Sequence, residues 1–134
     1  MTLRAPFAAL AVLALAAAAE DPRYDTSTVV DLRVVLVETR EVPAAGPLAG
    51  MHLLVRLENA RADSEPQDVY LGPAAFIKDI NFPLRVRDRL EVVGSKVKVG
   101  SATVILAREI RHNNDTLYLR ERTGEPMWAL TGRP

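Results

Sequence analysis

The chain of 134 residues contains no cysteine. This absence excludes disulfide bonds, a thiolate nucleophile and every metal or haem site that depends on cysteine. Histidine is scarce as well, because His52 and His112 are the two in the chain. A metal site usually needs three or four converging ligands, so these two would have to meet a carboxylate such as Glu109 or Asp115. We expect no cofactor, and His52 and His112 are the metal-ligand candidates.

Neither sign of charge dominates, since 17 Lys and Arg balance 17 Asp and Glu. An overall attraction to nucleic acid or anionic lipid is therefore not indicated. Aromatic side chains make up 5% of the residues, which is few for a surface that stacks single-stranded bases. We expect nucleic acid not to be a partner.

Signatures of catalysis are also missing. No serine lies in a Gly-x-Ser-x-Gly turn, which a hydrolase nucleophile would need. The carboxylates of the second half alternate with arginines, and this pattern favours cross-strand ion pairs at the surface over an acid/base pair. We therefore expect no enzymatic activity. The carboxylates concerned are Asp88, Glu91, Glu109, Glu121 and Glu125.

The first 19 residues have the pattern of a secretory signal peptide. A positive charge at Arg4 precedes an apolar run, and small residues stand at Ala17 and Ala19. The run is shorter than the ~20 apolar residues that cross a bilayer. We predict cleavage after Ala19, a periplasmic or secreted protein and no transmembrane span in the mature chain; a retained anchor is the alternative. The predicted parts are a signal peptide (1–19), a lead-in (20–27), one barrel domain (28–128) and a tail (129–134).

Apolar residues with a period of two predict strands on both sides of one short helix. We expect a bend or bulge in the long first strand and another at Gly94. After the third strand, Gly72 ends the strand and Pro73 begins a helix of at most two turns, with Phe76 and Ile77 facing the core. The predicted strands are 28–42, 51–58, 67–72, about 85–99, 102–110 and 116–121.

Three strands, a short helix and two or three further strands is the element order of an OB-fold. We predict an all-β, OB-fold-like Greek-key barrel of five to six strands, with the helix at one end. Trp128 is predicted to cover one end of this barrel. On the second strand, His52 is expected on the polar, outward face. An open β-sandwich or meander with a surface helical turn is the alternative.

A basic group in the middle third is the main binding candidate. Residues 78–98 carry six basic and three acidic side chains. Residues two apart on a strand share a face, so the lysines would project together, and a strand beginning at Arg85 would add a stripe of arginines. An anionic ligand with Tyr70 beside it is one hypothesis; a solvated edge that discourages strand pairing is the other. The candidate ligand-binding residues are Arg85, Arg87, Arg89, Lys96, Lys98 and Tyr70.

Several motifs of the second half are distinctive: "LGPAAF", Asp88 with "LEVVGSKV", "ILAREI" and "TLYLRERTGEPMW". Together, over about Leu53 to Trp128, they resemble a family of small exported bacterial proteins of OB-fold type. A weaker resemblance is to a domain of magnetosome-associated proteins and to the periplasmic bacterial OB-fold group linked to stress tolerance. The resemblance implies the fold but no catalytic residues. Its pattern often has glycine where Arg87 stands, so the turn before the fourth strand is expected to depart from it.

These observations favour a non-enzymatic binding or accessory module of the bacterial envelope; they do not identify its ligand, for which an anion is one candidate. Two alternatives stay open. One is a structural or protein-interaction module whose partner is an envelope protein. The other is a metal or redox accessory protein that would use His52 and His112.

Overall fold

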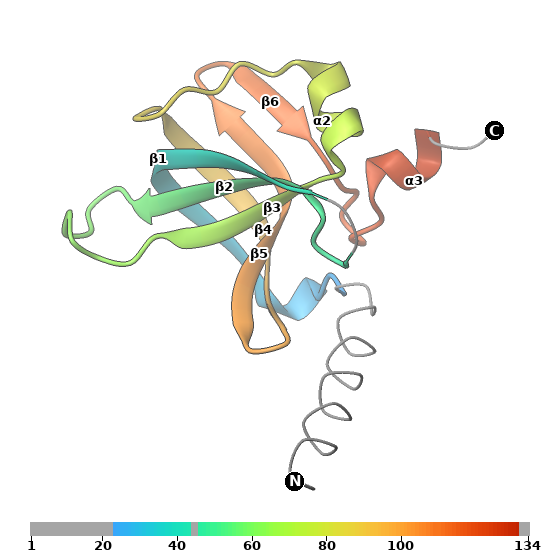
Figure 1. Cartoon of the computed structure of the whole chain (residues 1–134), viewed down its shortest axis with the longest axis horizontal. Coiled ribbons are helices and arrows are strands. Elements are labelled where there is room, and N and C mark those ends of the chain that lie inside the picture. Colours follow the sequence, from blue (N-terminus) through green and yellow to red (C-terminus); the bar gives the residue numbers. More distant parts are fainter. Residues whose placement is uncertain (1–22, 44–45, 132–134) are drawn as a thin grey trace, which may run out of the picture.

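A computed structural model describes residues 23–43 and 46–131. The predicted signal peptide, residues 1–19, lies outside the described residues. The elements are η1 (Thr26–Thr28), β1 (Val29–Val42), β2 (Gly50–Leu57), β3 (Gln67–Gly72), α2 (Ala74–Ile80), β4 (Arg89–Val99), β5 (Ala102–His112), β6 (Asp115–Tyr118) and α3 (Met127–Thr131). Figure 1 shows the strands wrapped around one another, with α2 and α3 on the same side of the barrel.

The sheet closes on itself. Its strand order is β3-β2-β1-β4-β5-β6, and a parallel pairing of β3 with β5 joins the two sides. All other pairings are antiparallel. The predicted OB-fold-like barrel is confirmed, and the β3–β5 pairing excludes the open-sandwich alternative. Strand β6 pairs with residues 109–112 of β5, beyond the residues of β5 that pair with β3.

Strand β1 makes closure possible because it pairs with two neighbours along its length. Residues 29–35 pair with β4, and residues 34–42 pair with β2. The register shifts between Leu36 and Glu38, where a bulge bends the strand. The predicted bulge in the first strand is thus confirmed, as is the one beside Gly94.

The barrel interior is filled by branched aliphatic side chains of every barrel strand. Helix α2 has no fully buried residue, but Phe76 and Ile77 pack against this core, as predicted. Trp128 packs against it as well. The fully buried side chains include Val34, Leu36, Leu53, Val55, Val69, Leu71, Val92, Ile105, Ile110 and Leu119.

Two strand limits differ from the prediction by three residues or more, while the others agree within about two. Strand β4 begins at Arg89, because residues 85–88 form a turn in which the Arg85 N–H donates to the Asp88 carboxylate (2.8 Å). Strand β6 ends at Tyr118, and the chain then makes a bridge between Arg120 and Pro126 before helix α3, which was not predicted.

Arg87 adopts φ +82° in the turn before β4. A side chain in this left-handed region costs about 1–2 kcal/mol, whereas glycine is free to adopt it. We expect Arg87→Gly to raise the free energy of unfolding by about 0.5–1 kcal/mol after the larger unfolded-state entropy of glycine is subtracted. The Arg87 N–H, which donates to the Leu36 carbonyl at 2.8 Å, is retained in this variant. Urea unfolding measures the difference.

Arg85→Gly is the matched control, since Arg85 lies in the same loop without a positive φ. It should lower stability slightly through backbone entropy alone. If Arg87→Gly were less stable than the unaltered protein, the strain assigned to this turn would be wrong.

Candidate functional site

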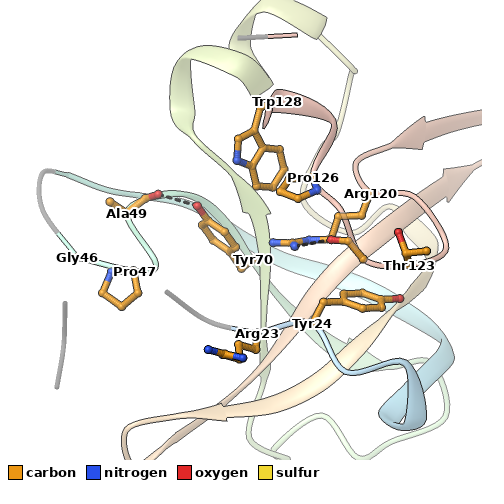
Figure 2. A pocket seen from close by; sticks show the side chains of 11 residues that line it. Arg23, Tyr24, Gly46, Pro47, Ala49, Tyr70, Arg120, Thr123, Pro126 and Trp128 are labelled. Carbon is orange, nitrogen blue, oxygen red and sulfur yellow. Dashed lines mark hydrogen bonds between the residues drawn. The ribbon is translucent and has the colours of Figure 1, made fainter. Parts of the chain in front are cut away.

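A pocket of about 590 Å³ lies beside the last strand of the barrel. Several parts of the chain enclose it: the lead-in before η1, the loop before β2, strand β3, the segment between β6 and α3, and α3 itself. Figure 2 shows the side chains around it. The lining residues are Arg23, Tyr24, Gly46, Pro47, Ala49, Tyr70, Arg120, Thr123, Gly124, Pro126 and Trp128.

Arg120 is the central charged group of the pocket. Its guanidinium lies 5.8 Å from the centre of the Tyr24 ring and 5.1 Å from that of the Trp128 ring. In Figure 2 the side chain runs between these two rings with its guanidinium directed toward Tyr70. A cation over aromatic faces gains electrostatic stabilisation, more so when it is shielded from water. Arg120 is therefore held by rings on both sides.

The charge of Arg120 has no carboxylate partner among the described residues. The residue is only 7% exposed, and burial lowers the pKa of its guanidinium. Arginine nevertheless stays protonated in proteins. One guanidinium nitrogen donates to the Gly124 carbonyl (3.0 Å), while the buried Nε has no hydrogen-bond partner in the described structure.

Tyr24 reaches the pocket because the lead-in is fastened to β4. The buried Ser95 hydroxyl donates to the Asp25 carbonyl and accepts from the Asp25 N–H, both at 2.9 Å. The Tyr24 ring then lies against Gly124, where any Cβ would collide with it. Gly124 also has φ +98°, so glycine is required here for two reasons.

Trp128 is held against the barrel by β3 and α2. The chain at Gly72 has φ +145°, and a Cβ there would approach the Trp128 ring to 2.7 Å. Trp128 meets the Phe76 ring edge-on at 5.5 Å and the Tyr70 ring at 6.5 Å. The prediction that Trp128 packs over the barrel is confirmed, and the Gly72-Pro73 break provides the room for it.

The wall opposite Arg120 is the loop before β2. The Tyr70 hydroxyl donates to the Ala49 carbonyl (2.9 Å), and the Leu48 carbonyl lies 2.7 Å from Nε2 of His52. As predicted, His52 lies on the face of β2 opposite to Leu53 and Val55, which pack in the barrel core. It is nevertheless only 4% exposed, because the loop before β2 covers this face.

The predicted basic group does not form one stripe. Arg85 and Arg87 lie in the turn before β4, because the strand begins only at Arg89. Lys96 and Lys98 are exposed near the other end of β4, roughly 20–30 Å from Arg89 at the usual rise per residue. Of the candidate ligand-binding residues, Tyr70 alone lines the pocket described above.

The two histidines do not converge either. His112 ends β5, and its Nε2 lies 3.5 Å from Asp88, whereas His52 pairs with Asp68. Within residues 23–43 and 46–131, no group of three or more His, Asp or Glu side chains is placed to hold a metal ion.

The predicted cross-strand ion pair is confirmed for Glu91 of β4, which lies 3.3 Å from Arg111 of β5. Glu109 also pairs with Arg111 (2.9 Å), but within the same strand. Glu121 and Glu125 are instead linked through their backbones, since the Glu121 N–H donates to the Glu125 carbonyl (2.9 Å).

The described chain is thus a small, closed, OB-fold-like β-barrel with an arginine-containing pocket beside its last strand. Residues 33–117 match the MamS/MamX magnetosome protein family, and the chain belongs to this family. The resemblance to a magnetosome-associated domain is thereby confirmed, while that to the other exported families stays a prediction. No curated protein and no solved structure matches the chain. The match ends before Arg120 and Trp128.

In the part of the chain that the structure describes, no helix has the length and apolar character needed to span a bilayer.

Gly72→Ala tests the contact between β3 and Trp128. We expect a loss of about 2 kcal/mol or more in the free energy of unfolding, because the new methyl group strains the backbone and displaces the ring. The chain has one tryptophan, so a red shift of its fluorescence reports the displacement directly.

Gly46→Ala is the control for backbone strain. Gly46 has φ +120°, but a Cβ there would meet no atom within 4 Å. This variant should lose less stability and leave the fluorescence maximum in place. Equal spectra for both variants would contradict the packing role assigned to Gly72.

Proposed function

We propose that the protein is a non-enzymatic binding module whose pocket takes a small anion with a flat apolar part. The observation that carries this proposal is the charge of the lining, which among the described residues includes Arg23 and Arg120 but no acidic side chain. The whole chain contains as many acidic as basic residues, so the excess of positive charge at the pocket is a local feature and does not follow from the composition. A site with unpaired positive charge favours an anion.

The geometry supports a ligand of mixed character. Arginine presents a planar set of donors that matches carboxylate, sulfonate or phosphate oxygens. Tyr70 and Trp128 place aromatic surface next to these donors, where a flat apolar group gains contact area. Arg23 is exposed at the same pocket and adds a second positive charge.

We place this binding module on the exported side of a bacterial membrane. The signal-peptide pattern of residues 1–19 supports this location, and the family name links the related proteins to magnetosomes. An accessory role at such a membrane is consistent with a small single-barrel protein.

A protein-interaction module is the second candidate. Tyr118 on the outer strand β6 is 59% exposed and Val86 is 58% exposed, and exposed apolar side chains of this size occur at interaction surfaces. Among the described residues, no cluster of metal-ligating side chains supports the hypothesis of a metal or redox accessory protein.

Benzenesulfonate is a suitable probe, because it joins a permanent negative charge to a flat ring. We expect it to quench or shift Trp128 fluorescence, whereas the neutral analogue benzenesulfonamide binds at least about tenfold more weakly, a difference of about 1.4 kcal/mol. Arg120→Lys keeps a charge but loses the planar donor set, and should weaken the affinity about tenfold or more.

Arg23→Glu reverses a charge on an exposed side chain, so it tests the pocket without risk to the fold. It should also weaken binding about tenfold, while Lys96→Glu, the same reversal elsewhere on the barrel, should change the affinity less than about twofold. Loss of binding in Lys96→Glu with unchanged affinity in Arg23→Glu would move the site to β4. No binding of benzenesulfonate to the unaltered protein would refute the proposed function.

A further inference from the structure

His52 lies between two hydrogen-bond acceptors. Its Nδ1 is 2.8 Å from an Asp68 carboxylate oxygen, and its Nε2 is 2.7 Å from the Leu48 carbonyl oxygen. A neutral imidazole has one N–H and one bare nitrogen, so it can donate to only one of them. The imidazolium form donates to both. With Asp68 ionised, both contacts are hydrogen bonds only when each ring nitrogen carries a proton.

The groups around His52 come from three parts of the chain. Asp68 and Tyr70 face it from β3, with the Tyr70 ring centre 5.1 Å from that of His52. Arg40 is its neighbour on β1, and the loop before β2 contributes the Leu48 carbonyl. Burial and the Arg40 charge lower the pKa of His52, but the hydrogen bonds and the Asp68 charge outweigh them, so its pKa is raised above the usual 6.5.

The hydrogen bond between His52 and the Leu48 carbonyl holds the loop that forms one wall of the pocket. Residues 46, 47 and 49 line the pocket, and the structure ties this loop to the barrel through the His52–Leu48 and Tyr70–Ala49 hydrogen bonds. Leu48 also packs against the smaller apolar cluster, which includes Tyr70 and Leu106. Loss of the proton on His52 would put a bare nitrogen against an acceptor and break one end of this connection.

We propose that protonated His52 is a pH-sensitive clasp that holds the loop of residues 46–49 against the pocket, so that the pocket is best formed in weakly acidic solution. A raised pKa in the folded state means that the stabilisation is complete below pH 6.5 and is lost as the pH rises through the folded-state value. The effect on ligand affinity rests on the proposed function. The effect on the loop does not.

Long-range proton–nitrogen NMR of the rings gives the direct test. In His112→Gln, His52 is the only histidine, and its titration is read without overlap. We expect both ring nitrogens to carry protons at pH 6.5, and deprotonation to occur above that pH. The Ala49 N–H donates to the Gly46 carbonyl at 3.3 Å. Its hydrogen-exchange protection factor should fall about tenfold as the pH rises through the titration midpoint of His52.

Asp68→Asn is the partner variant. It keeps the shape of the side chain but removes the charge that favours the imidazolium, so the His52 midpoint should fall by about one unit or more. His52→Gln should show the low protection of Ala49 at every pH. Asp68→Asn still answers the question if His52→Gln fails to fold, because it changes an only partly buried side chain.

Benzenesulfonate stays ionised throughout, so its affinity reports the pocket and not the probe. We expect binding about three- to tenfold weaker at pH 8.5 than at pH 6 in the unaltered protein and in His112→Gln, and no such change in His52→Gln. A neutral His52 at pH 6.5, constant Ala49 protection or equal affinity at both pH values would overturn the clasp. If the probe fails to bind while Ala49 protection follows the His52 titration, the clasp stands and the proposed function fails.

Discussion

The arrangement of the pocket depends on one cation. Arg120 follows β6, yet its two aromatic partners come from the lead-in and from α3. A buried guanidinium without a carboxylate is costly unless other groups stabilise it, and here two rings and the Gly124 carbonyl do so. The same contacts attach both ends of the described chain to the barrel. The two end segments and the pocket therefore form together. The Arg120 guanidinium, whose charge is available to a ligand, also helps to order these segments.

Close backbone approach is the second constraint. Gly124 accommodates the Tyr24 ring, and Gly72 accommodates Trp128, each at a positive φ. At Gly94, a Cβ would collide with the backbone of β5, and the bulge there places Ser95 under the lead-in, where it holds Asp25. Glycines at these three points thus leave room for the bulge and for the rings of Tyr24 and Trp128. The two rings in turn fix the position of the Arg120 guanidinium.

The candidate site was less predictable than the fold. Tyr70 was named from the sequence, but Arg120 was not, although it lies within the distinctive C-terminal motif. The reason is distance along the chain: Tyr24 lies nearly a hundred residues before Arg120, and no local pattern indicates that they meet. The burial of His52 was not predicted, because alternation along β2 gives the face of a side chain but not the loop that covers it.

Local patterns alone determined the element order, the bulges of β1 and Gly94, the Gly72-Pro73 break and the inward face of α2, because backbone preference and the period of two act over a few residues. Tertiary structure decided where these titratable and charged side chains came to lie. It separated Arg89 from the lysines of β4, buried His52 between two acceptors and brought Arg120 between two rings. These outcomes depend on which strands pair and in which register, and closure of the barrel sets both.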